Sequence, residues 1–334
     1  MRFVTIIIVT VVFSIIFISM SNAEEKAKLD IGGILESEFG YITNENDSES
    51  DFYLGTMELS IDPSLGSNVL GHLLVLYEYG ENDENFVLDE GDVSLKIPFV
   101  KNVEFSTSLG KLVIPFGEFN SHFVTDSYVL EMGETKQHAF GLSLNHEIIQ
   151  ICSTIYRDRL CVDGRNNSQV NAFALKLKGS VPQSLFGEKA SISLGGSFIS
   201  NIAGTDDLAN KFIETTLLKR VSGLNGFVSL NAMGVFLSAE TIMALDDIET
   251  SDGEVQKPKS INIELGYALP NMPVEIAGKY ENLSYSEDAK TKRFGGVLSV
   301  GIFSDTAKIK LEMLRTDEGD AKYTSIAGQL AIEF

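Results

Sequence analysis

Apolar and polar residues alternate along most of the chain. In the C-terminal segment, Ile326, Leu330 and Ile332 fall on one set of alternate positions, and the positions between them are mostly small or polar. Period two with one apolar face is the pattern of a β-strand whose two faces meet different surroundings. The same alternation recurs at 29–41, 53–62, 261–269 and 307–313.

Alternating segments of roughly nine to twelve residues, the length of a strand that crosses a membrane, recur throughout the chain. There are sixteen, at 29–42, 52–62, 68–79, 87–97, 103–110, 139–146, 148–157, 170–179, 190–200, 223–232, 235–244, 260–269, 274–282, 293–302, 306–315 and 322–334. An even number of strands places both ends at one rim, and a closed sheet of that size encloses an aqueous lumen. The alternative is a soluble β-sandwich whose polar face meets bulk water.

Three further features favour an all-β outer-membrane barrel. Short turns such as 62–67 and 270–272 alternate with longer polar connections, as the two rims of such a barrel require. The chain ends on Phe334 in the last strand, the position that outer-membrane barrels present to their assembly machinery. Seventeen acidic residues and no basic residue occur in five of the longer connections, 44–51, 80–85, 246–254, 286–289 and 317–320.

The first 23 residues have the pattern of a secretory signal peptide. Arg2 precedes an almost wholly apolar stretch at 3–18, and Ser21 and Ala23 supply the small residues of a cleavage site. We therefore expect cleavage after Ala23, export, and a barrel formed by residues 24–334 in the outer membrane. The alternative is an uncleaved N-terminal membrane helix.

The composition excludes other classes of protein. With 47 acidic and 26 basic residues, the formal net charge is −21, which leaves no basic face for nucleic-acid phosphates. Neither a G-x-S-x-G motif nor a phosphate-binding glycine loop is present, and the histidines lack metal-ligand spacing. We predict no cofactor and no enzymatic activity. The less favoured alternative is an outer-membrane hydrolase that uses His72, which the alternation places on the inward face.

One connection is much longer than the others. Between residues 111 and 138 the alternation breaks, and a structureless loop of this length is normally functional. We predict that it folds into the lumen as a constriction, whereas the alternative makes it two further strands of the wall. The residues that would then decide what passes are Lys111, Phe116, His122, Asp126, Glu131, Glu134, Lys136 and His138.

The register of the alternation also predicts which charged side chains face the lumen. Acidic candidates are Glu36, Glu38, Glu58, Glu78, Glu90, Asp92, Glu240, Glu264, Glu275 and Glu281. Basic candidates are Lys96, Lys176, Lys178, Lys279, Arg293, Lys308 and Lys310. The balance is acidic but mixed, so we expect a modest preference for cations.

Several segments resemble the LbtU-type siderophore porin family. They are FVLDEGDVSL at 86–95, GKLVIPFGEF at 110–119, VLEMGETK at 129–136, AETIMALDD at 239–247, KPKSINIELGY at 257–267 and the C-terminal GQLAIEF. The PFG and GET elements are the most distinctive. The resemblance implies an outer-membrane barrel that passively takes up a ferric siderophore or a similar small solute. The rival hypothesis is a non-transporting surface barrel, an adhesin or membrane-integrity protein.

Two further hypotheses concern the rim. Cys152 and Cys161 are the only thiols, and in an oxidising compartment they could close a disulfide at one hairpin. The acidic loops face an anionic glycolipid layer, and flexible oxygen-rich clusters suit divalent cations. The weak candidates for such a cation are Asp246, Asp247, Glu249, Asp252 and Glu254.

Overall fold

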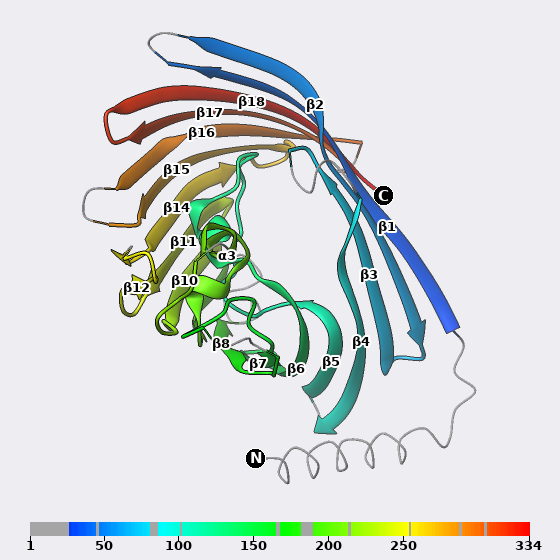
Figure 1. Ribbon diagram of the computed structural model, residues 1–334. Helices are drawn as coiled ribbons and strands as arrows, with labels where there is room; N and C mark the ends of the chain where they lie inside the picture. Colours follow the sequence, from blue (N-terminus) through cyan, green and yellow to red (C-terminus); the bar gives the residue numbers. More distant parts are fainter. Residues whose placement is uncertain are drawn as a thin grey trace.

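A closed antiparallel β-barrel of sixteen strands forms the wall of the molecule (Figure 1). The computed structural model describes residues 27–44, 47–80, 86–100, 102–164, 168–181, 190–212, 215–253, 255–286, 289–303 and 306–334. The first strand, β1 (Ala27–Thr43), pairs with the last, β18 (Ala321–Glu333), so the sheet has no free edge. Closure lets every wall strand pair on both sides, which is what a bilayer demands of a β-structure.

Each of the sixteen alternating segments becomes one wall strand, which confirms the fold expected from the sequence. Between β1 and β18 these strands are β2 (Ser48–Leu65), β3 (Val69–Glu78), β4 (Val87–Val100), β5 (Val103–Val113), β6 (Lys136–His146), β7 (Ile149–Tyr156), β8 (Ala172–Val181), β9 (Ala190–Ile199), β10 (Gly223–Ala232), β11 (Val235–Ala244), β14 (Lys259–Ala268), β15 (Val274–Ser284), β16 (Lys290–Ile302) and β17 (Ala307–Glu318). The predicted signal peptide lies outside the described residues.

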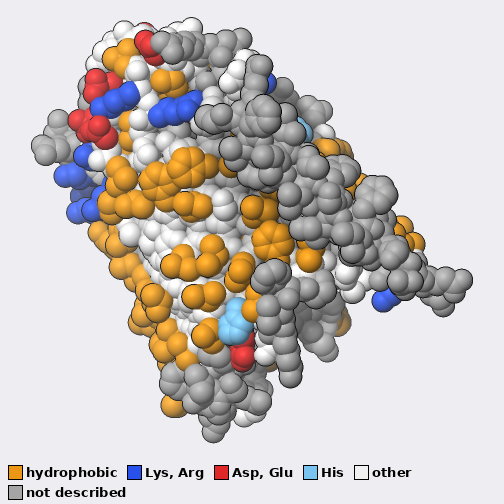
Figure 2. Space-filling view, turned by 90° about the horizontal axis from the view of Figure 1, so that it is seen from below, with side chains coloured by type: hydrophobic (Ala, Val, Ile, Leu, Met, Phe, Trp, Pro, Cys, Tyr) orange, Lys and Arg blue, Asp and Glu red, His pale blue; other side chains and the backbone are white. Residues whose placement is uncertain are grey.

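The alternation of the sequence separates the outer face of the wall from the inner face. In β14, Leu265 is 57% exposed, whereas the neighbouring Glu264 is fully buried inside. In β17, Met313 is exposed and Glu312 is buried in the same way. Figure 2 shows hydrophobic side chains spread over the outer face, with many of the charged side chains gathered toward one end. No helix within the described residues is long and apolar enough to cross a bilayer.

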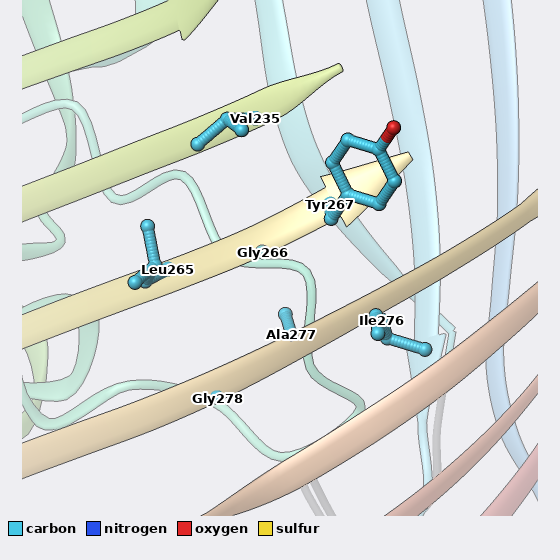
Figure 3. Close-up of a pocket in the computed structure, with 7 residues that line it drawn as sticks. All are labelled: Val235, Leu265, Gly266, Tyr267, Ile276, Ala277 and Gly278. Carbon is cyan, nitrogen blue, oxygen red and sulfur yellow. The ribbon is translucent and has the colours of Figure 1, made fainter. Parts of the chain in front are cut away.

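A shallow apolar groove of about 450 Å³ marks the outer face at β11, β14 and β15 (Figure 3). It lies between the side chains of Val235, Leu265, Tyr267 and Ile276, at the position where Gly278 contributes no side chain. The groove has almost no polar lining and faces away from the lumen. A functional site is therefore expected inside the barrel.

The long connections emerge at the rim opposite the chain termini, and several of them turn into the barrel. They contain α2 (Tyr128–Gly133), η3 (Ile202–Gly204), α3 (Asp206–Phe212) and the small hairpin of β12 (Ile248–Glu249) and β13 (Val255–Gln256). Figure 1 shows α3 and the neighbouring coil inside the ring of strands, where α3 contacts α2 and η3.

An apolar cluster joins these connections to the inner face of the wall. Phe116, Met132, Ile202, Leu208 and Phe212 are almost completely buried in it. These side chains pack against wall residues that extend from Leu112 of β5 to Leu283 of β15. We call the wall from β5 to β17, with its packed connections, the filled side, and β18 with β1 to β4 the open side.

Candidate functional site

The connection between β5 and β6, residues 114–135, is the inward loop around which the site is built. The Ile114 N–H donates to the Thr135 carbonyl at 2.8 Å, so the loop leaves and re-enters the wall at one point. Phe116 is fully buried in the apolar cluster, and Gly117 has a φ of 110°, which favours glycine. The PFG element therefore anchors the loop and turns it along the wall.

The GET element closes the same loop. A Cβ on Gly133 would lie 2.4 Å from Ile242 Cδ1 and 2.5 Å from the Phe119 ring, so a larger residue would force one of these side chains to move. The carbonyl of Glu134 accepts the N–H of Asp206, and the carbonyl of Thr135 accepts that of Ile114. The two most distinctive sequence elements meet at the base of the loop and join it to α3.

A wall glutamate fixes the start of the loop. Glu240 of β11 accepts the backbone N–H groups of Glu118 and Phe119, both at 2.8 Å. The same carboxylate accepts the side-chain amide of Asn225 at 2.7 Å. Charged acceptors make stronger hydrogen bonds than neutral ones, so one glutamate orders two successive residues of the loop.

Glu264 of β14 holds the next turn of the loop in the same way. It accepts the Ser121 hydroxyl at 2.7 Å and the His122 N–H at 2.9 Å. The ammonium of Lys279 lies 3.5 Å from this carboxylate, and both side chains are fully buried. The imidazole of His122 stacks on Phe236 at 4.0 Å, which fixes it against the wall.

Two more wall glutamates complete the series. Glu312 of β17 accepts the N–H of Val124 at 2.7 Å and the hydroxyl of Thr125 at 2.5 Å. Glu281 of β15 accepts the N–H of Tyr128, the residue that begins α2. Four glutamates on β11, β14, β15 and β17 thus hold the loop across the filled side. We call Glu240, Glu264, Glu281 and Glu312 the clamp glutamates.

Two buried cations balance the charge of the clamp glutamates. Arg293 pairs with Glu281 at 2.6 Å, lies over the Tyr128 ring and donates to the Asp126 carbonyl. Lys279 lies 4.5 Å from the centre of the Phe123 ring and donates to the Thr125 carbonyl at 3.3 Å. Buried carboxylates require such partners, because an unpaired charge away from water is very costly.

Glu118 of the loop itself reaches the wall in the opposite direction. Its carboxylate pairs with Lys176 at 2.7 Å and with Lys178 at 2.8 Å, both on β8. Burial alone would raise the pKa of Glu118, but hydrogen bonds from Lys176 and Lys178 more than offset this and hold it below its usual value. Glu118 therefore stays ionised and tethers the loop to β8.

An acidic cavity of about 870 Å³ lies between the loop and the open side. Glu36, Glu38, Glu78 and Asp89 contribute to it from the wall, and the other carboxylates come from the loop and α3. Nine carboxylates line this cavity, belonging to Glu36, Glu38, Glu78, Asp89, Asp126, Glu131, Glu134, Asp206 and Asp207. The basic side chains in the lining are Lys111, Lys136 and Arg159. The lining is strongly acidic.

The three cations of the lining already have partners. Lys136 pairs with Asp89 at 2.7 Å and with Glu134 at 3.4 Å, and Arg159 pairs with Asp206 at 3.0 Å. The Lys111 ammonium donates to the Leu88 carbonyl at 2.8 Å. These contacts leave the cavity with an excess of negative charge.

One carboxyl of the loop titrates near neutral pH. Burial raises the pKa of Glu131 to about 7, against the opposing effect of Arg293. Burial also raises the pKa values of Asp126, Glu134, Asp206 and Asp207. The charge of the cavity therefore depends on pH through the loop and α3.

Five of the eight residues predicted for the constriction line the cavity, namely Lys111, Asp126, Glu131, Glu134 and Lys136. Phe116 does not, because it is fully buried in the apolar cluster. His122 is held between Glu264 and Phe236 against the filled side. His138 is exposed, on the opposite side of β6 from the buried Ala139.

The predicted lumen-facing residues separate into three groups. Glu36, Glu38 and Glu78 line the cavity, whereas Glu240, Glu264, Glu281, Lys279 and Arg293 point inward but are covered by the loop. The remaining candidates are outside the cavity lining, namely Glu58, Glu90, Asp92, Glu275, Lys96, Lys176, Lys178, Lys308 and Lys310. His72, the candidate for the hydrolase alternative, bonds Asp62 at 2.6 Å. Asp206, Asp207 and Arg159 were not predicted from the sequence, because the connections that contain them show no pattern of an inward fold.

The structure bears on two hypotheses about the rim, and it corrects the disulfide. Cys152, in the middle of β7 opposite Lys176, and Cys161 are free thiols in the structure. In the acidic cluster, Lys219 binds Asp246 at 2.8 Å and Glu249 at 3.2 Å. Within the described residues, which exclude Glu254, no three His, Cys, Asp or Glu side chains are arranged to hold a metal.

Comparisons with known proteins agree with the barrel. No family model matches the chain. It is 24% identical to a UPF0422 protein of Coxiella burnetii over 71% of this chain and 53% of that protein. It is 22% identical to a UPF0422 protein of Legionella pneumophila over 78% of this chain and 53% of that protein. The chain thus spans about half the length of these curated relatives.

Solved structures that resemble the chain are outer-membrane porins and channels. Salmonella typhi OmpF in complex with daunomycin has a TM-score of 0.65 at 12% identity, covering 94% of this chain and 100% of that one. An anion-selective porin from Comamonas acidovorans has a TM-score of 0.64 at 12% identity, covering 92% and 100%. The DcaP channel of Acinetobacter baumannii has a TM-score of 0.63 at 10% identity, covering 94% and 99%. At these identities the likeness concerns the fold, a porin-like outer-membrane barrel.

Proposed function

We propose that the protein is a passive outer-membrane channel for small solutes and that it prefers cations. The observation that carries this proposal is the acidic cavity between the inward loop and the open side. Carboxylates that line a channel attract cations and repel anions. The proposed preference is opposite to that named for the porin from Comamonas acidovorans, although the barrels are alike.

A ferric siderophore is the finer proposal for the solute, and it rests on the sequence resemblance alone. The acidic lining narrows this proposal to complexes without net negative charge, because like charges in a half-buried cavity repel strongly. The same proposal includes export through a signal peptide, contact with outer-leaflet glycolipid, and insertion by the barrel-assembly machinery through Phe334.

Conductance of the purified barrel in planar lipid bilayers tests the function. We expect discrete single-channel steps and, in a salt gradient, a reversal potential of the sign given by cation selectivity. Absence of steps from a folded, heat-resistant barrel would favour the rival, a non-transporting surface barrel. Steps with anion selectivity would support a channel but contradict the proposal that the acidic cavity sets its ion preference.

A further inference from the structure

Carboxylates face the acidic cavity from two separate parts of the chain. Glu36 and Glu38 belong to β1 on the open side, and we call them the wall pair. Glu131 belongs to α2 and Asp207 to α3, and we call them the loop pair. No ion pair joins any of these four to a lysine or arginine of the described chain.

A second, independent observation points to a ligand with hydrogen-bond donors. Gln329 of β18 lines the cavity beside the wall pair and is only 6% exposed. Its Nε2 donates to Glu38 at 2.9 Å, which fixes the orientation of the amide, and its buried Oε1 has no hydrogen-bond partner among the described residues. A buried acceptor without a donor is unfavourable, so a ligand N–H placed here gains a hydrogen bond that the protein lacks.

The ligand must be extended rather than a single metal ion. The described residues contain no group of three or more carboxylate, imidazole or thiol side chains that converges on one point. The negative charge is spread over two sides of the cavity, and Leu76 and Leu130 contribute apolar surface to its lining. A chain of methylene groups with a positive charge at each end matches both features, because its stem packs on apolar surface and its ends seek carboxylates.

We propose that this cavity binds linear aliphatic diamines and polyamines. One ammonium group is held by the wall pair and Gln329, another by the loop pair, and the methylene chain lies along Leu76 and Leu130. This inference rests on the proposed function, since it names the class of solute that the channel selects. Each ammonium supplies three donors, enough for Glu36, Glu38 and the free Oε1 of Gln329.

Single-channel recording and calorimetry with defined amines test the proposal. Putrescine and spermidine should interrupt the current and release or absorb heat on binding to the detergent-solubilised barrel. Butylamine, with one charge, and magnesium chloride, with two charges at one point, should each need roughly tenfold higher concentration, because they can engage only one pair. Equal potency of butylamine or magnesium would overturn the proposal.

Matched variants locate the site. The double variant Glu36→Gln with Glu131→Gln removes one carboxylate from each pair and should weaken spermidine binding by at least roughly tenfold. Gln329→Leu should weaken it less, because it removes a neutral acceptor. The control Glu104→Gln removes a carboxylate that pairs with Lys96 at 3.4 Å, outside the cavity lining, and should bind like the parent.

The outcomes separate this inference from the proposed function. A channel that conducts cations but shows neither block nor binding heat with polyamines overturns the inference and keeps the function. A barrel that does not conduct but loses polyamine binding in the double variant contradicts the function and keeps the binding site. Equal loss in Glu104→Gln would show general electrostatic attraction and overturn the site. Heat-resistant migration confirms that each variant is folded.

Discussion

Inward-facing glutamates occur on both sides of the barrel, but they have different partners. On the filled side, Glu264 and Glu312 are almost completely buried and accept hydrogen bonds from the backbone of the loop. On the open side, Glu36 and Glu38 face a cavity of about 870 Å³. The same residue type at the same phase of the β-alternation therefore has a structural role on one side and is available to a solute on the other.

The difference lies in what covers the carboxylate after the wall has formed. A loop without regular secondary structure carries many backbone N–H groups that need acceptors when water is excluded. The clamp glutamates supply these acceptors, and Lys279 and Arg293 keep their charge balanced. Without a loop against it, an inward glutamate contributes its charge to the lumen.

Replacing one glutamate on the filled side and one on the open side tests this difference in role. Of the predictions made, this one has the largest expected effect on the protein. Glu264→Gln leaves the fully buried Lys279 without its closer partner and weakens the hydrogen bonds to Ser121 and His122. Breaking a buried pair in this way costs roughly 3–5 kcal/mol, which we expect to release the loop from the wall. Limited chymotrypsin digestion should then cut at Phe119, Phe123 or Tyr128.

Glu36→Gln is the matched control, since it makes the same chemical change on the open side. Its loop should stay as resistant to chymotrypsin as that of the parent. Equal resistance of Glu264→Gln and the parent would show that the clamp glutamates are not needed to hold the loop.

Substitution of two glycines compares the tightly packed base of the loop with the outer face of the wall. Gly133→Ala forces a methyl group against Ile242 and Phe119, whereas Gly278→Ala meets its nearest atom, the Gly295 carbonyl, at 3.7 Å on the outer face. Overpacking of this kind costs about 1–3 kcal/mol, so Gly133→Ala should unfold at lower urea concentration. Gly278→Ala fills part of the outer groove and should unfold like the parent. Identical midpoints for the two variants would contradict tight packing at the base of the loop.

The sequence predicted the wall well because alternation is a local signal. All sixteen segments became strands, and Glu36, Glu78, Glu240 and Glu264 lie on the inner face of the wall. Each strand of a membrane barrel meets lipid on one side and polar surroundings on the other. The sequence of each segment therefore indicates which of its residues face outward and which face inward. The break in this pattern at 111–138 was also visible.

The content of the lumen could not be predicted in the same way. Which glutamates the loop covers depends on contacts between residues more than a hundred positions apart, such as Ser121 with Glu264. Asp206 and Asp207 enter the cavity because Met132 and Leu208 share one apolar cluster. The irregular connection between β9 and β10 has no periodicity that shows this packing.

Ion selectivity also tests the difference between the filled side and the open side, and the expected change in the permeability ratio is small. Glu36→Gln with Glu38→Gln removes two charges from the cavity lining and should lower the cation-to-anion permeability ratio by roughly twofold, because the local potential falls by a fraction of its total. Reversal potentials in a salt gradient measure this ratio. The control Glu312→Gln changes a carboxylate covered by Val124 and Thr125, so its ratio should change less than that of the double variant. The opposite ranking would contradict the division of the barrel into two sides.

The smallest expected effect is a dependence of selectivity on pH through Glu131. Burial, opposed by Arg293 of β16 and assisted by Asp207 of α3, Glu281 of β15 and Asp126 of the loop, raises its pKa to about 7. Because the pKa of an acid is raised, Glu131 is neutral below about pH 7 and gains a negative charge above it. The cation-to-anion permeability ratio should therefore rise between pH 6 and pH 8, by roughly half of its value, since one charge is added to an already acidic lining.

Glu131→Gln should abolish this step, and Asp207→Asn should move its midpoint to lower pH by removing a neighbouring negative charge. Asp320→Asn, which changes an exposed carboxylate in the turn between β17 and β18, should keep both the step and its midpoint. An unchanged step in Glu131→Gln would assign the titration to another group of the cavity.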